Sequence, residues 1–319
     1  MKKIVDNTRM IFRCCKLYYE KNMTQQEICK KLEISRPTVS RMLQAGREKG
    51  YVRIELIDPN SNGFEALEEA LERRYGLKEA IIVPTESGEH INGYLGKEAF
   101  CYLNRVLKPG SVLGVSMGNT LKNLLRAADM ADAPVDCTVV PIIGGLNEED
   151  ASIHANYLSA ELASIYGGKS EQFYAPAVLA DPIIRKGLLA ERAFCRLHEL
   201  HKKLDVIITG VGVPDRGMSS LVRGGYISEE KLHHYLQTGL AGDIALQLFD
   251  EKGRTEPFEE HNCCVSGFRL NQFEKVPLRI GIAAGEARVR AFAGALRGGF
   301  INIAILDQSC AQALWNLAR

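Results

Sequence analysis

The stretch QQEICKKLEISRPTVSRMLQ, residues 25–44, decides the fold of the first part of this chain. It has the pattern of a helix-turn-helix, in which two short helices cross steeply over small and apolar side chains. Apolar residues recur at the spacing that such a crossing needs, namely Ile28, Leu32, Ile34, Val39 and Met42. We expect Cys29, a small residue, to lie where the helices approach most closely.

Both expected helices carry start signals. Thr24 followed three residues later by Glu27 predicts a capping box. Ser35 is expected to cap the second helix, with Pro37 in its first turn, where a missing N–H group costs little. Glu33 stands where this turn usually has glycine, and a left-handed conformation there costs roughly 1 kcal/mol for another residue. The helix-turn-helix tolerates that cost.

Charge separates this head from the rest of the chain. Residues 1–57 contain 13 Lys and Arg against 6 Asp and Glu, a net charge of +7, and the remainder has a net charge of −6. The alternative, an ordinary helical hairpin inside a larger core, does not explain such a basic surplus. A basic head on an acidic body is typical of a protein that binds a polyanion.

The second helix, expected from about Arg36 to Lys49, predicts the contacts with DNA. If Val39 and Met42 point inward, the outward side chains are Arg36, Ser40, Arg41 and Gln44. We expect the two arginines to bind guanine and Gln44 to bind adenine in the major groove. Ser35, Thr38 and Lys30 are expected to hold phosphates. The alternative for each arginine is a solvated position or a contact with phosphate alone.

Length and composition indicate a protein with two domains, one small and one of ordinary enzyme size. Of the 319 residues, 46% are hydrophobic and 25% are charged, as in a soluble globular protein. The chain has no run of 18 apolar residues, and its N-terminus, MKKIVDNTR, lacks the apolar stretch of a signal peptide. We therefore expect a cytoplasmic protein without membrane contact.

The nine cysteines predict neither a metal site nor a disulfide framework. Cys14–Cys15 and Cys263–Cys264 are adjacent pairs that cannot easily bridge, and no C-x-x-C spacing occurs. Scattered thiols in odd number fit a reducing compartment. We expect no metal and no other cofactor.

The organisation along the chain predicts a helix-turn-helix domain over 1–57, a linker over 58–63 and an effector domain over 64–319. A helical pattern covers 7–21, the alternating segment 51–57 is expected to form a strand or wing, and a second helix covers 64–76.

Beyond residue 80, short apolar runs alternate with helical segments. Eight runs are expected to be strands: 80–83, 111–115, 137–143, 172–176, 205–212, 242–250, 278–285 and 301–307. Runs such as VIIT and INIAIL are apolar on both faces, as in a parallel sheet covered by helices on both sides. The fold class is therefore α/β with an open parallel sheet.

Glycine-rich turns mark where this sheet is expected to bind a ligand. Several strands run into such turns, which are GVSMGNT (114–120), IIGGLNEED (142–150), TGVGVPD (209–215) and AAGEARVRA (283–291). Backbone N–H groups in such turns suit phosphate or polyol hydroxyls, at the carboxyl edge where open sheets bind ligands. None is G-x-G-x-x-G or a Walker A loop, which disfavours a dinucleotide or ATP site.

Several longer motifs occur in a characteristic order. They are MTQQEICKKLEISRPTVSRML (23–43), GVSMGNTL (114–121), VVPIIGG (139–145), GDIALQLFD (242–250) and GIAAGEARVRAFAGALRGGFINIAILDQSCAQAL (281–314). In content and order they resemble the SorC family of bacterial transcription regulators. The resemblance implies an effector domain similar to sugar-phosphate isomerases and deaminases, sugar or phosphosugar effectors, and a tetramer.

Two positions differ from the family pattern. The family usually has Trp or Gly where this chain has Met117, and Lys where it has Arg288. Arginine keeps a cation and a bidentate fork for phosphate. The segment from Val139 to Glu149 contains no lysine, so a Schiff base with an aldehyde effector cannot form there.

We expect the effector at the carboxyl edge of the sheet. The phosphate is assigned to Ser116, Gly118, Asn119, Thr120 and Arg288. Closure over the sugar is assigned to Gly144, Gly145 and Leu146, with hydroxyls bound by Asp243 and Asp307. The alternative is that the glycines only reverse the chain and that Arg288 pairs with Glu286. Binding is expected to move the loops at 142–150 and 209–226 and so shift the DNA-binding heads.

Two functions are compatible with this pattern. The first is a DNA-binding regulator of a carbohydrate operon that senses a phosphorylated sugar or sugar alcohol. The second is a sugar-phosphate isomerase or deaminase with a DNA-binding head, for which Asp243, Asp250, Glu286 and Asp307 are candidate bases. The histidines lack a paired carboxylate motif, so we favour the regulator. Because one head buries little DNA surface, we expect a homo-oligomer, a dimer or tetramer.

Overall fold

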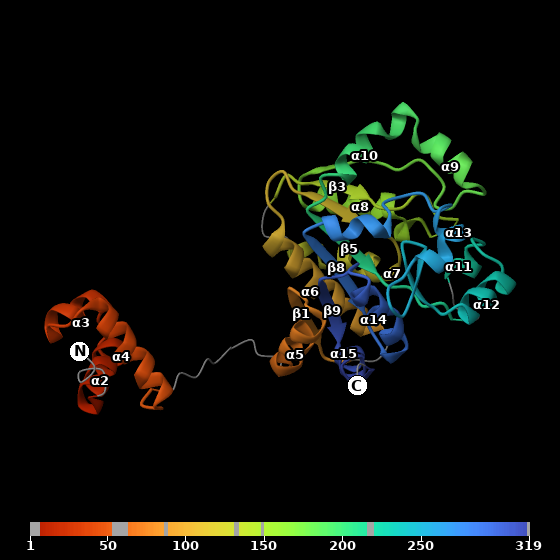
Figure 1. Ribbon diagram of the computed structural model, residues 1–319. Coiled ribbons are helices and arrows are strands. Elements are labelled where there is room, and N and C mark those ends of the chain that lie inside the picture. Colours follow the sequence, from red (N-terminus) through yellow and green to blue (C-terminus); the bar gives the residue numbers. More distant parts are fainter. Residues whose placement is uncertain are drawn as a thin grey trace. The chain divides into compact units, whose positions relative to one another are not determined.

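In the computed structural model the chain divides into two units, Met1–Ser61 and Asn62–Arg319, each with its own core (Figure 1). The structure describes residues 7–52, 63–85, 89–130, 134–147, 150–215 and 220–317. Most of the strand expected at 51–57 and of the linker expected at 58–63 therefore lies outside the described residues.

The first unit is helical. It contains α2 (Thr8–Cys15), a π-helical turn η1 (Lys16–Glu20), α3 (Gln25–Leu32) and α4 (Arg36–Glu48). The predicted capping box starts α3, since Glu27 N donates to Thr24 Oγ1 and Thr24 N donates to Glu27 Oε2. Glu33 ends α3 with a φ of 52°, so the left-handed turn forms here without glycine.

The core of this unit lies between α2, α3 and α4. Ile11, Cys14, Ile28, Val39 and Met42 are completely buried in it, as the pattern of residues 25–44 predicts for the last three. Cys29, by contrast, is only partly buried. The close approach that requires a small residue lies instead between α2 and α4, where a side chain at Gly46 would overlap Sγ of Cys15.

The second unit is built on a seven-stranded sheet of order β1-β9-β8-β5-β2-β3-β4, in which every neighbouring pair is parallel. The strands are β1 (Glu79–Val83), β2 (Val112–Val115), β3 (Thr138–Pro141), β4 (Lys169–Ser170), β5 (Val206–Gly210), β8 (Leu278–Ala283) and β9 (Ile303–Asp307). This confirms the predicted open parallel sheet.

Helices cover both faces of this sheet (Figure 1). Helices α6 (Glu89–Val106) and α8 (Ala155–Ile165) pack on one face, and α5 (Glu65–Tyr75), α10 (Cys195–His201), α14 (Val289–Arg297) and α15 (Gln308–Leu317) pack on the other. Successive residues of β5 alternate between the two cores, with Ile207 in one and Val206 and Ile208 in the other. The remaining helices are α7 (Asn119–Lys122), α9 (Pro182–Leu189), α11 (Ser220–Arg223), α12 (Glu229–Gln237) and α13 (Glu259–Asn262).

Two of the predicted strands are wrong in detail. Residues 242–250 form a hairpin of β6 (Leu240–Ile244) and β7 (Gln247–Asp250) instead of one strand, because Ala245 and Leu246 turn the chain at φ values of 50° and 61°. Neither residue type signals such a turn.

Residues 172–176 form no strand, and the sheet ends instead at β4. The amide of Asn156 occupies both the N–H and the C=O of Phe173, and Pro176 has no N–H to donate. In the described residues the segment therefore makes only an isolated bridge, between Pro176 and Gly145, and no strand.

None of the helices in the described ranges has the length and the apolar character that a membrane crossing needs.

Candidate functional site

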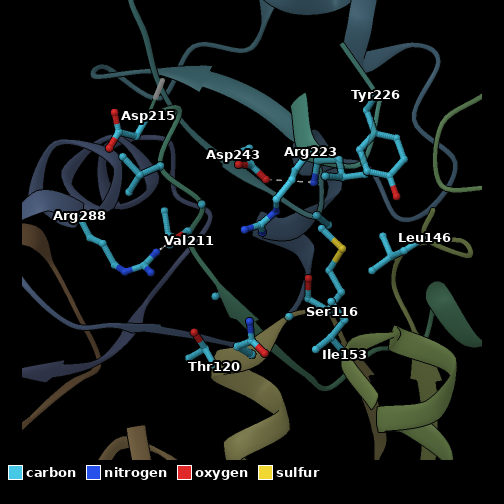
Figure 2. Close-up of a pocket in the computed structure, with 18 of the residues that line it drawn as sticks. Ser116, Thr120, Leu146, Ile153, Val211, Asp215, Arg223, Tyr226, Asp243 and Arg288 are labelled. Atoms are coloured by element: carbon cyan, nitrogen blue, oxygen red, sulfur yellow. Dashed lines mark hydrogen bonds between the residues drawn. The ribbon is translucent and has the colours of Figure 1, made fainter. Parts of the chain in front are cut away.

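Strands β2, β5 and β8 are neighbours, so the loops after their carboxyl ends meet at one edge of the sheet. These loops surround a cavity of about 430 Å³, shown in Figure 2. The β6–β7 hairpin and the loop after β3 complete its wall. The lining residues are Ser116–Thr120, Leu146, Ile153, Gly210–Val213, Asp215, Arg223, Tyr226, Asp243, Ala245, Leu246, Ala284, Ala287 and Arg288.

The turn after β2 offers backbone donors to this cavity. Gly118 has a φ of 107°, and its N–H donates to Ile153 O at 2.9 Å while its carbonyl accepts from Leu121 N. Among the described residues, no atom accepts a hydrogen bond from the N–H groups of Asn119 and Thr120, which line the cavity. Two such groups at a helix start suit an anion.

Two arginines reach the cavity from different loops (Figure 2). Arg288, in the turn after β8, is partly buried and donates from Nη1 to Val211 O at 2.9 Å. Arg223, in α11, is exposed and forms no hydrogen bond or ion pair with another residue that the structure describes. Within the described residues, Arg288 forms no ion pair with Glu286, the alternative considered above. Both guanidinium groups therefore retain donors for a ligand.

Asp243 is a buried carboxylate in the wall of the cavity, 4% exposed. Its Oδ2 accepts from Leu246 N at 3.2 Å, and its backbone exchanges two hydrogen bonds with Gly212. Burial raises the pKa of Asp243 to about 6, although the Leu246 hydrogen bond and Arg288 act in the opposite direction. A ligand hydroxyl that donates to this carboxylate would replace part of its missing hydration.

A pair of hydrogen bonds connects the loop after β3 to the loop after β5. Asn147 N donates to Tyr226 Oη at 2.7 Å, and Asn147 Nδ2 donates to Gly224 O at 3.2 Å. Leu146 and Tyr226 line the cavity beside this connection (Figure 2). The two loops that we expect to respond to a ligand are therefore in direct contact.

The head presents a separate polar surface along α4. Arg36, Ser40, Arg41 and Gln44 are exposed, as predicted from the inward positions of Val39 and Met42. Arg41 Nε donates to Pro37 O at 3.3 Å, and Gln44 Nε2 donates to Glu48 Oε1 at 2.8 Å.

Ser35 stands at the N-cap of α4 as predicted, but its side chain does not bond a backbone N–H. Its hydroxyl lies 2.8 Å from the Thr38 hydroxyl instead. The backbone donors at the start of α4 are therefore not capped by Ser35. Lys30, the other residue assigned to phosphate, is exposed on α3.

Comparisons with known proteins match both units. A family model described as "Putative sugar-binding domain" matches residues 60–316, and the MarR family model matches residues 17–59. The sorbitol operon regulator of Klebsiella pneumoniae is 30% identical over 97% of this chain and 98% of its own length. The chain belongs to the SorC family.

Three further comparisons support the membership in the SorC family. The deoxyribonucleoside regulator of Bacillus subtilis is 31% identical over 98% of both chains. The crystal structure of full-length SorC from Klebsiella pneumoniae matches 97% of this chain and 99% of its own, with a TM-score of 0.72 and 30% identity. The sugar-binding domain of a transcriptional repressor from Vibrio fischeri matches 80% of this chain and 99% of its own, with a TM-score of 0.72 and 27% identity.

In this SorC-family chain, the structure brings together seven of the ten residues that the sequence assigns to the effector. Ser116, Gly118, Asn119, Thr120, Leu146, Asp243 and Arg288 all line the cavity. The other three do not.

Gly144 and Gly145 lie beside Ala175 and Pro176 instead, where a side chain at Gly144 would overlap Ala175 O. The carboxylate of Asp307 accepts from Gly285 N, Cys310 N, Thr85 Oγ1 and Ser309 Oγ. Its oxygens are used to fix the turn that leads to Arg288.

Sequence reasoning missed Arg223, Asp215 and Tyr226 as site residues. They follow β5 within the segment 209–226, which we expected to move. Its first part, TGVGVPD (209–215), is one of the glycine-rich turns expected at the ligand, but no residue of it was assigned to the effector. For Arg223 and Tyr226 the signal was weak, since both lie beyond that turn and α11 is only four residues long.

Proposed function

We propose that this chain is a transcriptional regulator of a carbohydrate operon, in which α4 binds operator DNA and the cavity binds a phosphorylated sugar or sugar alcohol. The observation that carries the proposal is the composition of the cavity wall. Open N–H groups and two guanidinium groups lie at the same cavity as a buried carboxylate. This combination suits a ligand with an anionic end and a hydroxyl-bearing end.

The phosphate is assigned to the turn after β2 and to the arginines. Asn119 and Thr120 offer backbone N–H groups, Ser116 and Thr120 offer hydroxyls, and Arg288 offers a planar set of donors. Charge-assisted hydrogen bonds of this kind are about twice as strong as neutral ones. Arg223 adds a second cation, which forms no ion pair with a carboxylate that the structure describes.

The sugar end is assigned to Asp243. An ionised carboxylate only accepts hydrogen bonds, and several hydroxyls on one ligand can serve as donors to it. Asp307 is not part of this proposal, because four protein donors already engage it.

We infer that the chain binds the sugar without converting it. Of the four candidate bases named above, Asp243 alone lines the cavity, since Asp250 bonds Arg254 and Lys252 and Glu286 is exposed. Among the residues that the structure describes, no histidine, lysine or glutamate lines the cavity. Isomerisation requires a base and an acid on either side of the substrate, and the cavity offers one buried carboxylate. Incubation with sugar phosphates, followed by product analysis, should show binding without turnover.

We further propose a homodimer or homotetramer. The apolar stripes of α2 and α5 are used within their own units, where Ile11 and Leu71 are completely buried. Tyr174, Ile183 and Ile184 are exposed on the second unit and offer apolar surface for pairing. Light scattering at micromolar concentration should give a mass above that of one chain, and a monomeric mass with and without DNA would contradict this.

The function is tested by release of DNA. The intact protein is bound to a fluorescent fragment of the region upstream of its own gene, and fluorescence anisotropy is followed during titration with matched phosphorylated and unphosphorylated sugars. The proposal expects one phosphorylated compound to change DNA affinity by roughly 5- to 150-fold. It also expects DNA to change the affinity for that compound by the same factor. A protein that binds the fragment but responds to none of the phosphosugars would contradict the effector assignment.

A further inference from the structure

Cys263 and Cys264 form a partly exposed dithiol at the end of α13, outside the effector cavity. Their Sγ atoms lie 3.3 Å and 3.6 Å from the same acceptor, the carbonyl oxygen of Glu260. Both thiols are partly exposed, whereas the other adjacent pair, Cys14 and Cys15, is buried in the head. Soluble reagents can therefore reach one pair and not the other.

The residues just before this pair hold the β6–β7 hairpin. His261 is buried, and its Nε2 lies 2.9 Å from Leu246 O. Asn262 accepts from Leu248 N at 2.7 Å and donates to Leu248 O at 2.9 Å. These contacts fix both the turn and the second strand of the hairpin to α13.

The hairpin in turn forms the carboxylate wall of the cavity. Leu246 N donates to Asp243 Oδ2, and Asp243, Ala245 and Leu246 all line the cavity. The left-handed conformations of Ala245 and Leu246 are costly for residues other than glycine, so this turn depends on the contacts around it. A short series of direct contacts thus runs from the dithiol through His261 to Asp243.

The chain around the dithiol is firmly attached on both sides. Cys263 N donates to Glu259 O and Cys264 N donates to His261 O, which keeps the pair in a helical turn. On the other side, Cys264 O accepts from Leu179 N at 2.9 Å, and Val265 O accepts from Arg185 Nε at 2.6 Å. A change in the geometry of the pair cannot relax into a free chain end and must alter these contacts.

Joining two adjacent cysteines requires such a change. Neighbouring Cα atoms are about 3.8 Å apart, whereas disulfides prefer Cα separations of about 4.4–6.8 Å. A disulfide between neighbours is therefore strained, and strained, exposed disulfides are the readily reduced ones. A disulfide between Cys263 and Cys264 would therefore be a poor permanent link, but its easy reduction suits a reversible modification.

We propose that Cys263 and Cys264 are a peroxide-modifiable dithiol whose oxidation to a disulfide loosens the β6–β7 wall of the effector cavity. One thiolate attacks a peroxide oxygen, the O–O bond breaks, and a sulfenic acid and one water form. The second thiol attacks the sulfenic sulfur, the S–S bond forms, and the second water leaves. The two thiols supply the two electrons that hydrogen peroxide takes up. That this wall belongs to an effector site rests on the proposed function, whereas the oxidation and its structural effect do not.

The experiment follows both steps on the intact protein. After treatment with hydrogen peroxide and blocking of free thiols, trypsin releases residues 255–269, which contain these two cysteines and no others. We expect this peptide to lose two hydrogen atoms and to regain them with dithiothreitol, while a peptide containing Cys14 and Cys15 stays reduced. Hydrogen–deuterium exchange of the Leu246 and Leu248 amides is expected to rise roughly tenfold on oxidation.

Variants separate this effect from general damage. Cys264→Ser cannot form the disulfide and should keep slow exchange at Leu246 and Leu248 in peroxide. Cys195→Ser, which removes an exposed thiol of α10, should respond as the unmodified chain does. Failure of residues 255–269 to form the disulfide, equal oxidation of Cys14 and Cys15, or a disulfide without faster exchange would each overturn the proposal. None of these readouts depends on the identity of the effector.

Discussion

In the wall of the cavity, the carboxylate of Asp243 fills the space that a side chain at Gly212 would take. Their backbones exchange two hydrogen bonds, at 2.8 Å and 3.2 Å, and a side chain at position 212 would overlap the carboxylate of Asp243. The absence of a side chain at 212 is therefore what allows a carboxylate to lie at this point.

Gly212→Ala is expected to displace the Asp243 carboxylate and to lower the affinity for the phosphosugar by more than about tenfold, since its hydroxyl contacts are lost. Overpacking of this kind should also lower the free energy of unfolding by roughly 1–3 kcal/mol. Calorimetric titration and urea unfolding measure the two effects. Gly187→Ala, on α9 with open space around it, is the control and should bind normally. Unchanged binding by Gly212→Ala would show that Asp243 does not contact the ligand.

Arg288→Ala is expected to weaken binding of the phosphorylated sugar by roughly 10- to 100-fold, because a charge-assisted hydrogen bond is lost. Binding of the unphosphorylated sugar should change little. Calorimetry with the matched pair of sugars measures the difference. Arg290→Ala removes a charge two residues away that pairs with Glu251 and does not line the cavity, so it should have no effect. If Arg288→Ala binds both sugars as the native chain does, the phosphate lies elsewhere.

The raised pKa of Asp243 predicts how stability depends on pH. The pKa is 3.8 in the reference state and about 6 in the folded protein. Between these values the folded state binds more protons than the unfolded state, so this group makes the protein more stable as the pH falls from 6 towards 4. The full shift corresponds to roughly 3 kcal/mol.

Asp243→Asn tests this dependence. Relative to the variant, the native chain should gain stability when the pH is lowered from about 7 to about 4.5, as measured by urea unfolding of both proteins. Other titrating groups, including the buried His261, are common to both proteins and cancel in the difference. A difference that is constant over this range would contradict a raised pKa at Asp243.

Arg41→Ala is expected to cost roughly 1–3 kcal/mol of operator binding and to relax sequence preference, because an arginine that reads guanine contributes to specificity. Anisotropy titrations with operator and random DNA measure this. Arg9→Ala removes the same charge from the exposed side of α2, outside the recognition helix. If Arg41→Ala loses the same affinity for operator and random DNA, Arg41 contacts phosphate rather than a base.

Glu33→Gly is expected to stabilise the head by about 1 kcal/mol, because Glu33 has a φ of 52° that glycine adopts without cost. Lys31→Gly is the control, because it places glycine inside α3, where the backbone is helical. It should destabilise the head by about 1 kcal/mol. Thermal unfolding of both variants measures the sign. Destabilisation by Glu33→Gly would mean that the glutamate side chain contributes more than the backbone costs.

The sequence predicted the elements that follow local rules. The capping box at Thr24 and the inward positions of Val39 and Met42 depend on spacing within one helix, and the structure has them. The turn at 116–120 was found because Gly118 lies three residues after the end of an apolar strand.

The features that sequence reasoning missed depend on tertiary contacts. Ala245 and Leu246 carry no turn signal, and their conformation is held by contacts with Asp243 and His261. Asp307 follows a strand as a ligand-binding carboxylate would, yet its oxygens face Gly285, Cys310 and two hydroxyls. Arg223 lies in α11, well beyond the end of β5, so its distance from a strand end gave no hint that it lines the cavity.

The close contact between Gly212 and Asp243 also limits how the ligand preference of such a cavity can change during evolution. Any mutation that adds a side chain at position 212 also displaces the Asp243 carboxylate. A single substitution there therefore cannot reshape this wall for a new ligand while keeping the carboxylate in place. Met117, Leu146 and Tyr226 lie on the remaining walls and carry side chains that can be exchanged one at a time. Laboratory selection for a response to a different effector should therefore accumulate its first substitutions at these three positions.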